Sequence, residues 1–326
     1  MTPTPCLITA TLCALCAAMA PVSSHSNEVF PERPIQLVVG FSAGGPADLV
    51  ARTLSTALGS ALGTQVTIDN KPGADGSIAA AIVARAKPDG YTLLLAPSTH
   101  AINASLYKKL TFDSVKDFAA VTLIGESPNI VAVNTQLPVK SMAEFISHAK
   151  AANPPLNYGS SSSITQFATE LFNIQAGTKM VRIPYKGAGQ ALPALLSGEV
   201  PVMFSSMMTL MPHVKSGRIR ALAVTSSSRV SIAPEIPTVA ESGLSSYSAS
   251  TWYGVLAPAS TPKPVIQKID MALKKVLSDG DVISKLEAQG LIRDQQIRDP
   301  GAFQAYLQSE IHKWRPVVEA TGVSID

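Results

Sequence analysis

The sequence predicts an α/β fold built from two lobes, with a ligand cleft between them. Residues 35–106 and 156–225 each alternate short apolar strands with helical segments, an order that favours sheets covered by helices. In each stretch, a loop of small residues joins the first strand to a helix, at residues 40–48 and 159–163. Ligands of such folds bind at the carboxyl ends of strands, so we expect the two loops to face each other across the cleft.

The first lobe begins with the apolar run 34–39, which predicts a strand with a proline at its edge. From Leu49 to Ala61, apolar residues recur at helical spacing and predict a helix with one buried stripe. The elements expected next are a strand at 66–68, a turn-rich loop at 70–76, a helix at 77–86, a strand at 91–96, a short helix ending at 106, and strands at 119–124 and 129–133.

The strand at 129–133 begins the second lobe, and a helix at 141–151 follows it, where Ser141 and Glu144 have the spacing of a capping box. The elements expected next are strands at 156–158, 181–184, 202–204 and 220–225, helices at 164–176, 188–196 and 210–215, a helical turn at 237–243, a strand at 251–256, and two long amphipathic helices near 265–277 and 303–314. If the last helices return to the first lobe, the chain crosses twice, near 126–133 and 248–254, and forms a hinge. We therefore expect one lobe from 27–128 plus 252–326 and another from 129–251.

The loop at residues 40–48 has the features of an anion site. Gly40, Gly44 and Gly45 lie between an apolar strand and a helix that carries Asp48 in its first turn. The first backbone N–H groups of a helix have no intrahelical acceptor, and the helix dipole adds a partial positive charge. We expect the loop to hold a carboxylate or a similar anion. A tight strand–helix turn without a ligand is the alternative at this point.

Composition excludes several classes of protein. Among the 326 residues, 46% are apolar and 15% charged, which allows a substantial core and argues against disorder. The formal net charge of +3 is small, and Lys and Arg are scattered. We therefore expect no nucleic-acid partner.

Residues 1–26 have the pattern of a secretory signal peptide. The apolar segment 7–20 is too short to span a bilayer comfortably, small residues follow it, and the first charge is Glu28. Cleavage between residues 20 and 27 would remove all three cysteines. We expect an exported protein of the periplasm. An uncleaved membrane anchor is the alternative.

The sequence offers binding loops without recognisable catalytic machinery. Beyond the export segment, the histidines are His100, His148, His213 and His312, and none shows metal-ligand spacing. We expect no metal and no cofactor, and only His100 follows a strand-end loop. The loop at residues 159–163, the serine loop, lacks the G-x-S-x-G pattern of a nucleophile elbow. These features favour a receptor, with an exported serine hydrolase as the alternative.

Six stretches in order resemble one known family. They are PIQLVV with GGPAD (34–39 and 44–48), NKPGADG (70–76), KPDGYTL (87–93), PYKGAG (184–189), IPTVAESG (236–243) and TWYGVLAP (251–258). On these motifs the chain, from about Pro31 to its C-terminus, resembles the Bug family of periplasmic solute-binding receptors. Members of this family are the substrate-binding components of tripartite tricarboxylate transporters.

The resemblance implies a type II periplasmic-binding-protein fold that closes on a small carboxylated solute. In this family, backbone amides, hydroxyls and waters of the loop after the first strand and of a facing loop hold one ligand carboxylate. Carried over by position, the ligand-binding residues are Phe41, Ser42, Ala43, Gly44, Gly45, Ala47, Asp48, Ser98, Thr99, Ser160, Ser161, Ser162, Ser163, Thr165, Tyr185, Ser205 and Ser206. The facing loop lacks the usual glycines and the following histidine and is shorter, which leaves room for an unusual ligand.

From residues and resemblance together, we expect an exported, monomeric receptor. It would bind a small organic acid, namely a mono- or dicarboxylate, an amino acid or an aromatic acid, and deliver it to membrane transporter subunits. A sensor that presents the ligand to a membrane histidine kinase needs the same fold and remains open.

Overall fold

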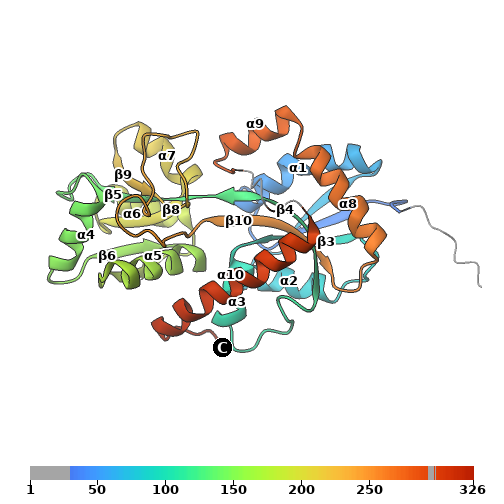
Figure 1. Cartoon of the computed structure of the whole chain (residues 1–326), viewed down its shortest axis with the longest axis horizontal. Helices are drawn as coiled ribbons and strands as arrows, with labels where there is room; N and C mark the ends of the chain where they lie inside the picture. Colours follow the sequence, from blue (N-terminus) through green and yellow to red (C-terminus); the bar gives the residue numbers. More distant parts are fainter. Residues whose placement is uncertain (1–29, 293–296, 298) are drawn as a thin grey trace, which may run out of the picture.

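A computed structural model describes residues 30–292, 297 and 299–326, and it consists of two lobes that are each built on a five-stranded sheet (Figure 1). The predicted signal peptide lies outside the described residues. The first sheet has the order β2 (Val66–Asn70), β1 (Ile35–Val39), β3 (Thr92–Pro97), β10 (Thr251–Pro258), β4 (Phe118–Ser127). The second has the order β7 (Val181–Pro184), β6 (Asn157–Ser160), β8 (Val202–Ser206), β5 (Asn129–Asn134), β9 (Ile219–Val224).

Both sheets are mixed. Strand β1 pairs in parallel with β2 and β3, and β6 pairs in parallel with β7 and β8. Strands β10 and β5 run antiparallel to both of their neighbours. Because the parallel strands of each lobe end at one edge of their sheet, the loops that follow β1, β2 and β3 meet there, as do those after β6 and β8.

Helices cover both faces of the first sheet. Along β1, Ile35, Leu37 and Val39 pack with α1 (Pro46–Leu62), α8 (Lys263–Val276) and α9 (Gly280–Ala288). Val38 points to the opposite face and packs with α2 (Ser77–Ala84), α3 (Thr99–Leu106) and α10 (Pro300–Thr321). This alternation follows from the two-residue period of a strand, and burial on both faces explains the continuous apolar run.

The second sheet is covered in the same way. Helices α4 (Met142–Ala151) and α5 (Ser163–Ala176) pack on one face around Phe145, Phe172 and Phe204. Helices α6 (Ala188–Ser197) and α7 (Met207–Lys215) cover the other face. The predicted cap at Ser141 is confirmed, since its side chain accepts a hydrogen bond from the Glu144 amide at 3.2 Å.

Two details differ from the sequence expectations. Residues 237–243 form turns and no helix. Helix α9 stands between the two long helices that were expected to follow each other. It begins where the Asp279 carboxylate accepts from the amides of Asp281 and Val282.

The chain passes between the sheets at Pro128, and it returns into β10 at Thr251. These two crossings are neighbours, because Thr251 pairs with Ser127. The first sheet draws its strands from residues 35–127 and 251–258, and the second draws its strands from 129–224. We propose the lobe boundaries expected from the sequence, 27–128 plus 252–326 and 129–251.

A buried carboxylate fixes the last helix against strand β10. Glu310 on α10 is 4% exposed, and its Oε2 accepts from the indole N–H of Trp252 at 3.1 Å and of Trp314 at 3.0 Å. The Lys313 ammonium lies 2.8 Å from the other carboxylate oxygen. In Figure 1, α10 lies obliquely along the molecule, and it contacts α3 and β4 as well as α5 of the second lobe.

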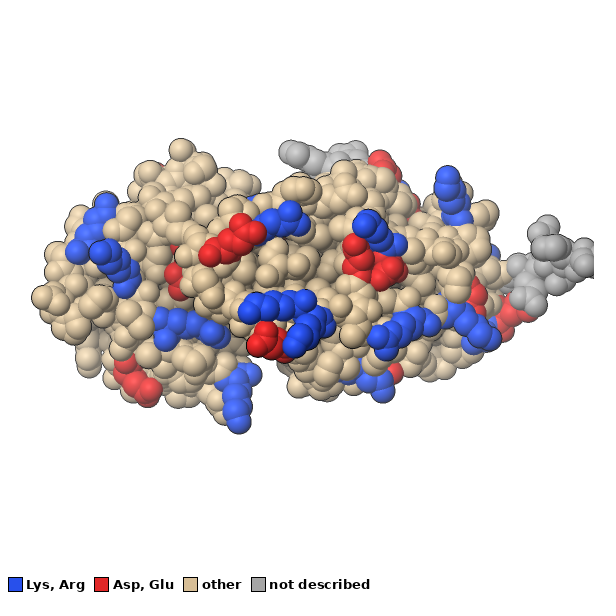
Figure 2. Space-filling view, turned by 90° about the horizontal axis from the view of Figure 1, so that it is seen from below, with Lys and Arg blue, Asp and Glu red and all other residues tan. Residues whose placement is uncertain are grey.

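On the face shown in Figure 2, basic and acidic side chains are both scattered over the surface. Among the described residues, no helix is long and apolar enough to cross a membrane. The same part of the chain holds no group of three His, Cys, Asp or Glu side chains with the spacing of a metal site.

Candidate functional site

A cleft of about 410 Å³ opens between the two lobes. The first lobe contributes the loops after β1, β2 and β3, and the second contributes the loops after β6, β7 and β8. The lining residues are Gly40, Phe41, Ser42, Gly45, Pro46, Ala47, Pro72, Gly73, Asp75, Pro97, Thr99, Asn129, Ser161, Ser162, Ile164, Thr165, Lys186, Gly187, Ala188, Ser205, Ser206, Thr209, Thr251 and Tyr253. Helix first turns of both lobes, from α1 and from α5, thus face the same space.

Glycine is required twice in the loop after β1. Gly44 has φ +79°, a left-handed conformation that side chains with a Cβ rarely adopt. A Cβ on Gly40 would lie 2.6 Å from the Gly76 Cα, so this loop and the loop after β2 touch backbone to backbone. The close approach brings two lining segments of the first lobe into one surface.

The Asp48 side chain fixes this loop through hydrogen bonds. Its buried carboxylate accepts hydrogen bonds from the Gly44 amide at 2.8 Å, Arg52 Nε at 2.8 Å and Asn70 Nδ2 at 3.0 Å. Burial alone would raise the pKa of Asp48, but the Arg52, Gly44 and Asn70 hydrogen bonds outweigh it and lower the pKa. Asp48 is 1% exposed and does not line the cleft, so it acts as a scaffold for the loop.

Across the cleft, backbone groups of the serine loop form hydrogen bonds with the Thr165 side chain. The amides of Ser161 and Ser162 both donate to Thr165 Oγ1, each at 3.2 Å. The Thr165 hydroxyl in turn donates to the Ser162 carbonyl at 3.0 Å. Thr165, the third residue of α5, therefore holds the two residues that precede the helix, as in a capping box.

Asp75, which the sequence did not single out, reaches the same helix end from the other lobe. Its Oδ2 accepts a hydrogen bond from the Ser163 amide at 2.9 Å, across 88 positions of sequence. Burial raises the pKa of Asp75, and the contact with Ser163 and the charge of Arg182 oppose that effect only in part. A carboxylate of the protein thus occupies part of the anion-binding end of α5.

The structure brings most of the predicted ligand-binding residues to the cleft and leaves seven outside its lining. Those that line it are Phe41, Ser42, Gly45, Ala47, Thr99, Ser161, Ser162, Thr165, Ser205 and Ser206. Those that do not are Ala43, Gly44, Asp48, Ser98, Ser160, Ser163 and Tyr185.

Gly44 and Asp48 hydrogen-bond each other, and three more of the seven also have contacts elsewhere. Ser160 Oγ accepts from Arg182 Nε at 2.6 Å, and the Tyr185 hydroxyl donates to Glu199 at 3.0 Å. Ser163 contributes its amide to Asp75. Reading every residue of a loop as a ligand contact ignores that neighbouring side chains point in different directions.

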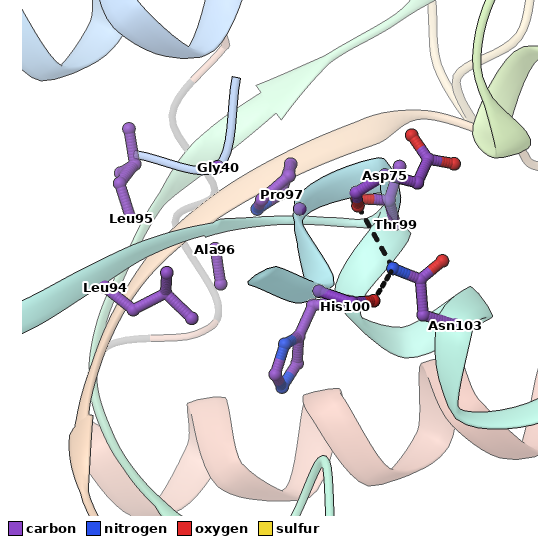
Figure 3. A pocket seen from close by; sticks show the side chains of 11 residues that line it. Gly40, Asp75, Leu94, Leu95, Ala96, Pro97, Thr99, His100 and Asn103 are labelled. Atoms are coloured by element: carbon purple, nitrogen blue, oxygen red, sulfur yellow. Dashed lines mark hydrogen bonds between the residues drawn. The ribbon is translucent and has the colours of Figure 1, made fainter. Parts of the chain in front are cut away.

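His100 lines a small space of about 10 Å³, drawn in Figure 3, which shares Gly40, Asp75, Pro97 and Thr99 with the lining of the cleft. Its ring is buried, and its Nε2 lies 3.0 Å from the Ser114 carbonyl, which can only accept. Burial lowers the pKa of His100 to about 4. The ring is therefore neutral at pH 7, with the hydrogen on Nε2.

The ligand-binding set expected from the sequence omits several lining residues. Asp75 and Lys186 are the charged members of the lining, and Asn129, Thr209 and Tyr253 are further polar or aromatic members. For Lys186 and Asp75 a signal existed, because both lie in loops that follow parallel strands. Asn129 and Tyr253 lie in the crossing strands, where nothing in the local sequence marks a residue as facing the cleft.

Solved structures of the same architecture include two that contain a bound carboxylate. MatC from Rhodopseudomonas palustris, solved with bound malate, is 32% identical, with a TM-score of 0.78 over 89% of this chain and all of that one. Another R. palustris protein, solved with adipate, is also 32% identical, with a TM-score of 0.80 over 90% of this chain and 99% of that one. The periplasmic binding protein BugD gives 31% identity and a TM-score of 0.78 over 90% and 99% of the two chains.

The sequence comparisons agree with the structural ones. Protein BugT of Bordetella pertussis is 34% identical over 310 residues, which cover 94% of either chain. The model of the tripartite tricarboxylate transporter family receptor matches residues 50–323. The resemblance to the Bug proteins and the two-lobed periplasmic-binding-protein fold are thereby confirmed. The chain belongs to the family of tripartite tricarboxylate transporter receptors, whose members are periplasmic solute-binding proteins.

Proposed function

We propose that this receptor binds a small organic carboxylate in the cleft between its lobes and hands it to the membrane subunits of its transporter. The observation that carries the proposal is the 410 Å³ cleft, into which the first turns of α1 and α5 both open. Helix first turns present backbone N–H groups without intrahelical acceptors, which suit an anion. Malate and adipate in two relatives support this ligand class.

On the side of the first lobe, the proposed ligand contacts are Phe41, Ser42, Gly45, Ala47 and Thr99. On the side of the second lobe, the proposed contacts are Ser161, Ser162, Thr165, Ser205 and Ser206. We also propose that residues 1–26 are an export signal and that the mature protein is a monomer in the periplasm. A family of receptors, and not of enzymes, supports binding without turnover.

A thermal-unfolding panel of mono-, di- and tricarboxylates, aromatic acids and amino acids tests the ligand class. A ligand at one hundred times its dissociation constant stabilises the folded protein by about 2.7 kcal/mol, which a shift in melting temperature reports. Calorimetric titration then gives the affinity of each hit. If no acid in the panel raises the melting temperature, the carboxylate proposal fails.

Ser42→Glu tests the place of binding. Ser42 is exposed and lines the cleft beside the first turn of α1, so a new carboxylate there would repel a bound anion. We expect at least tenfold weaker binding of the best ligand. Thr56→Glu is the matched control, because Thr56 is exposed on the same helix and lies outside the cleft lining. Equal affinities in the two variants would place the ligand elsewhere.

A further inference from the structure

Asp75 lies in an uncommon backbone conformation that the structure holds firmly. It belongs to the short 3₁₀ turn η1 (Ala74–Gly76) and has φ +52° and ψ +35°, in the left-handed region. Residues with a Cβ adopt this region at a cost, which neighbouring contacts must offset. Here, Thr99 Oγ1 and Asn103 Nδ2 both donate to the Asp75 carbonyl at 3.0 Å.

This backbone conformation sends the side chain into the cleft. In Figure 3, the Asp75 carboxylate points away from His100 and Asn103, while the backbone carbonyl faces Asn103. Oδ2 accepts from the Ser163 amide, the Ser163 side chain also lowers the pKa of this carboxyl, and no hydrogen bond from another described residue reaches Oδ1. Asp75 also lines the 410 Å³ cleft, so one carboxylate oxygen remains for a ligand.

The position of Asp75 divides the cleft by charge. At the α5 end, the Ser163 amide donates to Asp75, and the amides of Ser161 and Ser162 donate to Thr165. A second carboxylate placed there would meet the negative charge of Asp75. At the first turn of α1, the Asp48 carboxylate is paired with Arg52 and lies outside the cleft lining, so a ligand carboxylate is favoured at that end.

A cationic group near Asp75 would relieve a real cost. Burial raises the pKa of this carboxyl, which means that the protein compensates its negative charge incompletely. The Ser163 hydrogen bonds oppose this effect first and the Arg182 charge second, and together they do so only in part. A ligand ammonium beside the free Oδ1 would supply the missing compensation.

We propose that Asp75 makes this receptor selective for acids that also carry an amino group. The ligand carboxylate lies at the first turn of α1, and its ammonium binds Asp75 where the loop after β2 faces α5. This inference rests on the proposed function, because it assumes that an organic acid binds in the cleft.

The test compares acids that differ only by an amino group. Aspartate against succinate, glutamate against glutarate, and phenylalanine against 3-phenylpropionate are titrated into the wild-type protein by calorimetry. We expect the amino member of the best-binding pair to bind at least tenfold tighter. Wild-type protein that binds the plain acids equally well or better overturns the proposal without any variant.

Asp75→Asn assigns the preference to the residue. Asparagine keeps an oxygen for the Ser163 amide and removes the charge, so we expect the amino member to lose at least tenfold in affinity while the plain acid is unchanged or gains. Asp89→Asn, a change of the same kind at a residue outside the cleft lining, is expected to leave both affinities within twofold. A preference that survives in Asp75→Asn overturns the proposal.

Failure of the broader function has a different signature. If no acid of any pair and no acid of the thermal-unfolding panel binds to wild-type or Asp75→Asn protein, the carboxylate receptor itself is refuted, and the Asp75 proposal with it. If the plain acids bind both proteins and the amino group has no effect, only the Asp75 proposal is refuted.

Discussion

The buried histidine predicts how the stability of this receptor responds to acid. His100 is 5% exposed, its ring centroid lies 4.9 Å from that of Phe118 and 6.0 Å from that of Phe112, and its Nε2–H donates to the Ser114 carbonyl. Protonation of the ring would place a positive charge in this apolar setting, and burial accordingly lowers the pKa of His100 from 6.5 to about 4.

Proton linkage gives the direction and the size of the effect of His100 on stability. The folded pKa of His100 is below the unfolded one, so the unfolded chain binds more protons and stability falls as the pH falls. The contribution is fully present above pH 6.5 and is lost as the pH falls through about 4. The difference between the two pKa values corresponds to a contribution of about 3 kcal/mol to the free energy of unfolding. About 2 kcal/mol of this contribution is lost between pH 7.5 and pH 5.

Urea unfolding at pH 7.5 and pH 5 measures this contribution. We expect His100→Gln, which keeps an N–H donor but cannot titrate, to lose about 2 kcal/mol less free energy of unfolding than the wild type over that interval. His312→Gln, at an exposed histidine of α10, is the control and should follow the wild type. If His100→Gln and the wild type lose the same free energy, the neutral buried histidine is refuted.

Three further predictions concern the frame of the cleft. Glu310→Leu leaves two buried indole N–H groups without an acceptor and should lower the free energy of unfolding by about 3 kcal/mol. Glu310→Gln keeps one acceptor oxygen and should lower it by less. Equal losses of the two variants in urea unfolding would contradict this. Gly40→Ala forces apart two backbone segments that line the cleft and should weaken ligand binding at least tenfold in calorimetry, so unchanged affinity would show that the loops tolerate separation. Tyr185→Phe should bind within twofold of wild type, because the hydroxyl contacts Glu199 and not the cleft; a large loss would return Tyr185 to the site.

Most elements of the fold could be predicted because apolar periodicity and turn residues mark them locally. Helix α9 escaped because its start, Ser278 to Asp281, combines a serine, two aspartates and a glycine, which are typical of a loop. Its buried face consists of Val282 and Leu286 only, so the periodic signal is short. At residues 237–243 the error was the opposite one, because a helical turn was predicted and none formed. Thr238 and Glu241 cap each other there without a helix.

The candidate site could be predicted to the level of its loops and not to the level of its side chains. The loops after β1 and β6 follow from strand order, because parallel strands bring their carboxyl ends together. The role of Asp48 as a scaffold depends on Arg52 and Asn70, which a helix cap alone does not predict. Asp75 depends on a left-handed backbone and on an amide of the other lobe, and neither leaves a periodic trace in the sequence.

The crossing strands link the cleft to the far end of the chain. Thr251 and Tyr253 line the cleft, whereas Trp252 between them points to the opposite face and donates to Glu310 of α10. The last helix therefore fixes the strand that forms the cleft floor, and this anchor lies beside the point where the chain changes lobes. Opening of the lobes would leave the Trp252 anchor intact but break the hydrogen bond of Asp75 to α5. We expect that contact to bias the empty receptor toward closure, and a ligand ammonium at Oδ1 would leave it in place.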